Sequence, residues 1–93
     1  MATRQETSAI KVEGTYTDGE ISPGQLEGHL RNQLGAYTGD IKLGRITTDY
    51  NDLSDTTHFI IHADYYPDNI VISAVSQVFA AVAKTNHVFV QQA

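Results

Sequence analysis

The segment 56–66, which reads TTHFIIHADYY, decides the predicted fold of this chain. Its residues alternate between two faces of an extended backbone, as in a β-strand. One face holds Thr57, Phe59, Ile61, Ala63 and Tyr65, and the opposite face holds His58, Ile60, His62, Asp64 and Tyr66. Both faces carry aliphatic or aromatic groups, which is typical of a strand in the middle of a sheet. We therefore expect a central strand here and place the other elements around it.

Two strands are predicted on its N-terminal side. In residues 10–16 the apolar side chains and a glycine fall on every second position, and the pair Asp18-Gly19 then favours a turn. In residues 40–50 the apolar parity changes, and a β-bulge at Gly44-Arg45 would return all the apolar side chains to one face. The polar loop 50–55 is long enough for a hairpin between this strand and the central one.

The first helix is predicted to begin at Ser22. Ser22 can cap the helix, Pro23 already has helical φ, and Gln25 can complete a capping box. The apolar stripe of this helix consists of Leu26, Leu30 and Leu34. Gly35 is placed to end the helix. Gly28 weakens it, and we expect this glycine to let another backbone pack closely.

The second helix is predicted to follow Pro67, with Asp68 as its N-cap. Its apolar positions repeat at helical spacing at Val71, Val75, Val78 and Val82, with Ala74 and Phe79 beside them. Residues 87–92 form the last predicted strand, in which Val88 and Val90 lie opposite Phe89.

This order of elements predicts an α+β domain with the ferredoxin-like βαββαβ arrangement. Such a domain is a four-stranded antiparallel sheet with two helices on one face, and its first and third strands lie in the middle. We expect residues 8–93 to form this single domain and residues 1–7 to form a flexible N-terminal tail. The other face of the sheet would then be open.

The composition is that of a small folded protein. With 41% hydrophobic and 18% charged residues, the 93-residue chain has enough apolar content for one packed core. It contains no cysteine, which excludes disulfides and thiolate metal sites and leads us to expect a cytoplasmic location.

The net charge is −5, and no Lys or Arg occurs between Arg45 and Lys84. Such a surface repels phosphate and anionic lipid, so we expect neither nucleic-acid nor membrane binding.

The histidines are the first candidates for chemistry, because imidazole binds metals and transfers protons near neutral pH. His58 and His62 share a face, but four strand residues separate them by about 13 Å, too far to hold one ion. His62 and Asp64 are about 6.6 Å apart and could form a small active site with a tyrosine such as Tyr16. We favour the simpler interpretation, two polar residues on an open sheet face, because an acid-base site also needs a pocket.

The carboxylates Asp49, Asp52 and Asp55 recur at every third position of a polar loop and raise the question of a calcium site. Leu53 and Ser54 stand where an EF-hand loop needs a ligand and a glycine, so we interpret the three as a solvated acidic surface. The motifs of nucleotide-binding loops, α/β-hydrolases and zinc proteases do not occur. We assign no catalytic residue, metal or cofactor, and leave enzymatic activity open.

The open sheet face is the predicted functional surface, with an interface made of His58, Ile60, His62, Phe89 and Gln91. Phe89 and Ile60 within a ring of polar groups are typical of a partner interface, because monomers seldom leave large apolar patches in water. We expect a non-enzymatic interaction module that forms a homodimer, or binds a protein partner, through this face. One alternative is a small dimeric enzyme or ligand-binding protein with a pocket near His62 and Asp64. Another is an acidic inhibitor or decoy that offers the surface from Asp49 to Asp68 to a basic, nucleic-acid-handling protein.

Overall fold

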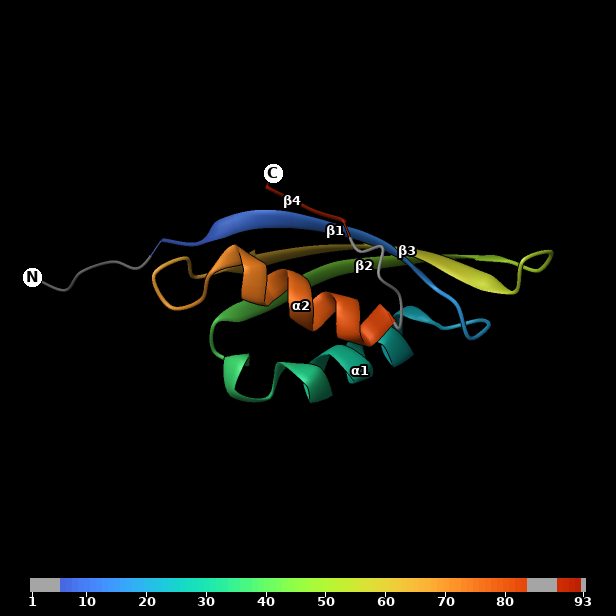
Figure 1. Ribbon diagram of the computed structural model, residues 1–93, viewed down its shortest axis with the longest axis horizontal. Helices are drawn as coiled ribbons and strands as arrows, with labels where there is room; N and C mark the ends of the chain where they lie inside the picture. The colour runs from blue at the N-terminus through green and yellow to red at the C-terminus, as the bar shows by residue number, and fades with distance from the viewer. Residues whose placement is uncertain (1–5, 84–88, 93) are drawn as a thin grey trace, which may run out of the picture.

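The computed structural model describes residues 6–83 and 89–92, in which two helices pack on one face of an antiparallel sheet (Figure 1). The elements in chain order are β1 (Ser8–Tyr16), α1 (Pro23–Leu34), the 3-10 helix η1 (Gly35–Tyr37), β2 (Ile41–Asn51), β3 (Thr56–Tyr65), α2 (Ile72–Ala83) and β4 (Phe89–Gln92). The α+β class, the βαββα order and the two helices are therefore confirmed. The first three strands form an antiparallel sheet, and the short β4 pairs with the free side of β1.

The order of the strands across the sheet is β2-β3-β1-β4, so β1 and β3 lie in the middle as predicted. The predicted bulge in β2 is also confirmed. Leu43 pairs with Ala63 and Ile46 pairs with Ile61, so Gly44 and Arg45 together face only one residue of β3. A Cβ atom at Gly44 would lie 2.8 Å from a backbone carbonyl oxygen of β3, so this position requires glycine.

The start of α1 is a complete capping box, as the sequence predicts. The Gln25 amide donates to the Ser22 hydroxyl oxygen at 3.2 Å, and the Ser22 amide donates to the Gln25 side-chain oxygen at 3.0 Å. The leucine stripe Leu26, Leu30 and Leu34 is buried, and Gly35 ends the helix with φ at 47°. The expectation for Gly28 is wrong, because a Cβ atom there would meet no other atom within 4 Å. Gly28 faces solvent rather than a second backbone.

The second helix begins later than predicted, at Ile72. The Tyr66 carbonyl accepts hydrogen bonds from the amides of Asn69 and Ile70, which makes a separate turn before the helix. Asp68 lies inside that turn and cannot be the N-cap, so this prediction is wrong. Val71 precedes the helix and is 64% exposed, whereas the later members of the predicted apolar face, Val75, Val78 and Phe79, are buried.

The loop between β1 and α1 is fastened to β3 by Thr57, which is fully buried. The Thr57 hydroxyl donates to the Gly19 carbonyl oxygen at 2.8 Å and accepts from the Ile21 amide at 3.1 Å. Gly19 has φ at 105°, the left-handed conformation expected of the Asp18-Gly19 turn. This tether fixes the position of Glu20 and of the N-terminus of α1 relative to the sheet.

Some predictions fall outside the described residues. These concern residues 87 and 88 of the last strand and residues 1–5 of the predicted tail. No helix in the described ranges is both long enough and apolar enough to cross a membrane.

Candidate functional site

The surface of the sheet that points away from α1 and α2 is called the open sheet face (Figure 1). The strand pairings place on it the described side chains of Lys11, Glu13, Thr15, Lys42, Thr47, Asp49, His58, Ile60, His62 and Asp64. Acids, bases and histidines therefore share this face, and its members from β3 are those that the alternation in residues 56–66 predicts.

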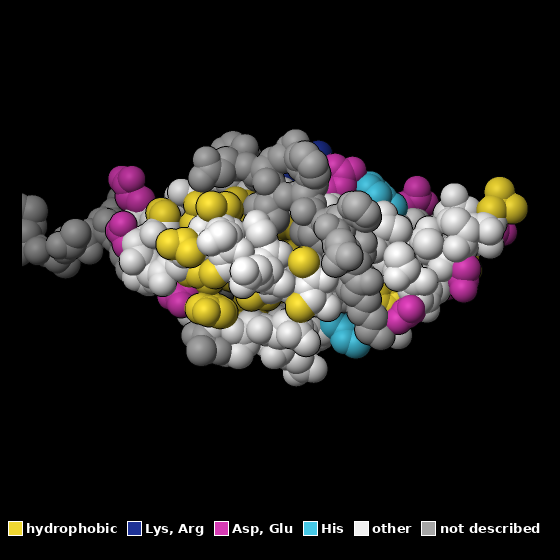
Figure 2. Space-filling model, in the orientation of Figure 1, with side chains coloured by type: hydrophobic (Ala, Val, Ile, Leu, Met, Phe, Trp, Pro, Cys, Tyr) yellow, Lys and Arg dark blue, Asp and Glu magenta, His cyan; other side chains and the backbone are white. Residues whose placement is uncertain are grey.

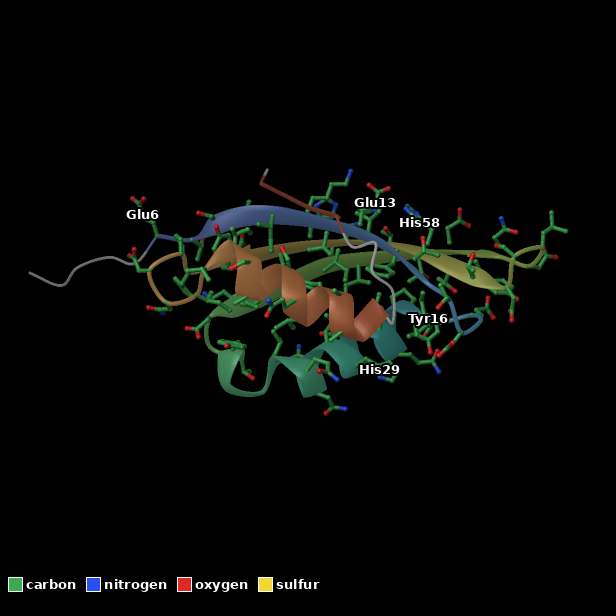
Figure 3. The ribbon with its side chains drawn as sticks, viewed as in Figure 1. Glu6, Glu13, Tyr16, His29 and His58 are labelled. Carbon is green, nitrogen blue, oxygen red and sulfur yellow. The ribbon has the colours of Figure 1, made fainter. Side chains whose placement is uncertain are left out.

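His58 and Glu13 form a side-chain pair on the open sheet face (Figure 3). The His58 Nε2 atom lies 2.9 Å from Glu13 Oε1, and the two side chains are 46% and 45% exposed. His58 pairs directly with Thr15 of β1, so Glu13 is its diagonal neighbour, and Asp49 of β2 is its direct partner on the other side. His58 therefore stands between two carboxylates.

The predicted interface residues Ile60 and Phe89 lie on strands that are not adjacent in the sheet. Ile60 of β3 pairs with Glu13 of β1, and Glu13 pairs with Phe89 of β4. Ile60 and Phe89 thus belong to one row across the sheet but are two strands, or about 10 Å, apart with a carboxylate between them. Parity predicts the face on which a side chain lies, whereas the strand register determines its neighbours. The side chains of Phe89 and Gln91 lie outside the described residues.

The candidate acid-base group is not assembled. His62 and Asp64 lie on the open sheet face, where their cross-strand partners are Lys11 and Lys42. Tyr16 packs against the core on the opposite side of the sheet (Figure 3). A hollow of about 160 Å³ beside the bulge is open to solvent and is lined by Ala9, Ile10, Gly44, His62, Ala63 and Asp64. It brings no tyrosine to the histidine.

Lys42 extends over the ring of Tyr66, with Nζ 5.4 Å from the ring centroid. Hydrogen bonding to Tyr66 and the charge on that group raise the pKa of Lys42, desolvation lowers it by less, and the Asp64 carboxylate adds the smallest increase. Lys42 is therefore a firmly positive group at one end of the open sheet face, next to the negative Asp64.

The aspartates of the predicted acidic surface are divided between different parts of the molecule. Asp49 lies on the open sheet face, whereas Asp52 and Asp55 lie in the turn between β2 and β3. Asp68 follows the other end of β3, roughly 30 Å away for a strand of this length. Within residues 6–83 and 89–92, no three His, Cys, Asp or Glu side chains are close enough to hold a metal ion. The aspartates of the expected acidic surface therefore lie at both ends of β3.

Comparison with known proteins identifies the fold only. No known family and no curated protein sequence matches this chain. Among solved structures, the C-terminal domain of the MgtC protein from Mycobacterium tuberculosis is similar, with 12% identity over 99% of this chain and 94% of that domain and a TM-score of 0.66. The de novo designed protein Foldit4 has 9% identity over 95% and 97% of the two chains, with a TM-score of 0.60. The uncharacterized protein TM1266 from Thermotoga maritima has 12% identity over 95% and 96%, with a TM-score of 0.54. The chain is a small α+β domain of the ferredoxin-like type.

Proposed function

We propose that this domain is a non-enzymatic protein-interaction module that self-associates through its open sheet face. The observation that carries the proposal is that no helix of the described residues covers this face of the sheet (Figure 1). The strand pairings also place side chains of both charges on it. We also infer that the complete chain has the ferredoxin-like βαββαβ arrangement, which the strand order β2-β3-β1-β4 supports.

The mixed charges favour a second copy of the chain as the partner. Lys42 lies beside Asp64 in one row of the face, and His58 lies between Glu13 and Asp49 in another part of it. In a two-fold symmetric contact the same patch meets itself, so a face with both signs can place acids against bases. A face with one sign only would repel its copy.

The apolar contribution to such an interface comes from two separate positions. Ile60 is half-buried within the sheet, and the backbone of Phe89 in β4 pairs with Glu13 on the other side of β1. Burial of one large apolar side chain contributes at most about 2 to 3 kcal/mol. Because the two positions are separated by a carboxylate, we expect a salt-sensitive association rather than a purely hydrophobic one.

The test is the mass of the protein in solution, measured by light scattering at micromolar concentrations. We expect a dimer for the parent and folded monomers for Ile60→Glu and Phe89→Glu. The matched control is Leu53→Glu, which adds the same charge at a 95% exposed apolar residue in the β2–β3 turn. We expect this control to stay dimeric.

Two outcomes would contradict the proposal. One is a parent protein that is monomeric throughout the concentration range. The other is a Leu53→Glu variant that dissociates as completely as Ile60→Glu, since added charge alone would then explain the effect. Circular dichroism of each variant distinguishes dissociation from unfolding.

A further inference from the structure

A second surface feature lies on the helix side of the sheet, where the β2–β3 hairpin extends past the N-terminus of α1 (Figure 1). It is a hollow of about 580 Å³, within the range of about 300 to 1,000 Å³ that is usual for ligand sites. Its lining is made of Glu20, Ile21, Ser22, Pro23, Gln25, Thr48 and Tyr50. The Thr57 tether holds one wall of the hollow in place, because it binds the loop on both sides of Glu20.

The charge around the hollow is negative. Glu20 is the charged residue of the lining. Asp55 lies next to the lining, because its carboxylate accepts a 2.6 Å hydrogen bond from the hydroxyl of Tyr50. Both carboxylates raise the pKa of the Tyr50 hydroxyl, Asp55 chiefly through its hydrogen bond and Glu20 through a smaller effect of its charge. The segments 12–30 and 46–83, which supply the lining, contain no Lys or Arg. Figure 2 shows acidic side chains around this end of the molecule.

An anion is a poor match for the hollow, although a helix N-terminus borders it. The Ser22 and Gln25 amides are already used in the capping box, and Pro23 has no amide hydrogen to donate. The helix end therefore lacks the cluster of free donors that anion sites use. The side-chain chemistry of the hollow favours a cation with an apolar portion.

We propose that this hollow binds an arginine side chain of a partner protein. Glu20 is placed to pair with the guanidinium group, which forms two parallel hydrogen bonds to a carboxylate. Tyr50 is 36% exposed, and its hydroxyl is held by Asp55, so its ring offers a fixed face for stacking of the guanidinium. Ile21 and Pro23 provide apolar surface for the aliphatic part of the side chain. The hollow is on the opposite side from the open sheet face, so this binding does not depend on self-association.

The probe is an acetylated and amidated tetra-arginine peptide, with tetra-citrulline as a neutral ligand of matched shape. We expect tetra-arginine to cause saturable amide NMR shifts in residues 20–25 and 48–50, and tetra-citrulline to cause none. Equal shifts with both peptides would overturn the proposal, because charge would then play no part. Saturation by free L-arginine at the same concentration would also overturn it, because the ligand would then be a small molecule.

The variants separate local pairing from general attraction. We expect Glu20→Gln to weaken tetra-arginine binding by up to about fivefold, as for an exposed ion pair, and Tyr50→Leu to weaken it similarly through loss of stacking. The control Asp68→Asn removes the same charge at the far end of β3 and is expected to leave the affinity unchanged at moderate salt. If Asp68→Asn weakens binding as much as Glu20→Gln, or the shifts spread over the open sheet face, the hollow is not the site.

Discussion

The ring of Phe59 on β3 lies against the backbone of Gly14 on β1. The two are cross-strand partners on the helix side of the sheet, and both are buried. A Cβ atom at Gly14 would stand 2.7 Å from Phe59 Cζ, which is too close for two carbon atoms. Gly14 therefore provides the space that the fully buried Phe59 ring fills.

Substitution of Gly14 should destabilise the domain. Gly14→Ala would push the Phe59 ring out of its place in the core, and overpacking of this kind costs about 1 to 3 kcal/mol. Urea denaturation followed by circular dichroism measures the loss. In a double-mutant cycle with Phe59→Leu, the alanine should cost less, because the smaller side chain leaves room for it. Equal costs in the two backgrounds would show that the ring is not the cause.

Substitution of Gly28 should have the opposite effect. This glycine is inside α1 and exposed, and a Cβ atom there would meet nothing within 4 Å. Gly28→Ala should therefore raise the free energy of unfolding by about 0.5 to 1 kcal/mol, through better helix propensity and a less flexible unfolded chain. The same denaturation experiment tests it, and a loss of stability would indicate a contact with α1 that involves this position.

The elements of this fold follow from local patterns, and for that reason the sequence predicts them well. Alternation identifies the faces of β1 and β3, and Ser22, Pro23 and Gln25 act within one turn to begin α1. The start of α2 is harder to predict. Asp68 has a side chain that commonly caps helices, but the amides of the following residues donate to the Tyr66 carbonyl and form a separate turn. A side chain that suits a cap does not determine which backbone groups are free.

The surface features depend on strand register, which the sequence leaves open. Parity predicts that Glu13 and His58 share a face, but only the pairing of β1 with β3 makes them neighbours and separates Ile60 from Phe89. The hollow at α1 has a similar origin. Its walls come from segments about 25 residues apart, and they meet because Thr57 binds the loop at Gly19. No local pattern around Glu20 or Tyr50 signals this arrangement.

Removal of the Thr57 hydroxyl should be costly. Thr57→Val keeps the shape of the side chain but leaves the Gly19 carbonyl and the Ile21 amide without their partner in a buried place. Unsatisfied buried groups of this kind cost about 1 to 3 kcal/mol in unfolding free energy. Thr47→Val is the matched control, since Thr47 is exposed and its one side-chain hydrogen bond is long, at 3.5 Å. We expect the control to change stability by less than about 0.5 kcal/mol.

The hydroxyl of Tyr50 should ionise at higher pH than an ordinary tyrosine. Its hydrogen bond to Asp55 raises the pKa of Tyr50, with further increases from burial and from the charges on Asp55 and Glu20. Asp55→Asn should lower this pKa towards the usual value near 10, because the negative acceptor is lost. The ¹³Cζ chemical shift of Tyr50, followed against pH by NMR, measures it directly. An unchanged titration in Asp55→Asn would show that this carboxylate is not the main cause.

The same pKa shift determines how the Tyr50 to Asp55 bond contributes to stability at alkaline pH. Because the pKa is raised in the folded state, the folded protein keeps the phenol proton at a pH where the unfolded chain releases it. The stabilisation is therefore fully present below about pH 10 and is lost as the pH rises through the folded-state pKa. Tyr50→Phe lacks this titration, so the difference in stability between the parent and Tyr50→Phe should be constant near neutral pH and shrink above about pH 10. Chemical denaturation of both proteins across this range checks it, since the remaining tyrosines and the lysines titrate in both and cancel in the difference. A difference that stays constant to the highest pH at which the domain folds would mean that the proton on Tyr50 is not linked to folding.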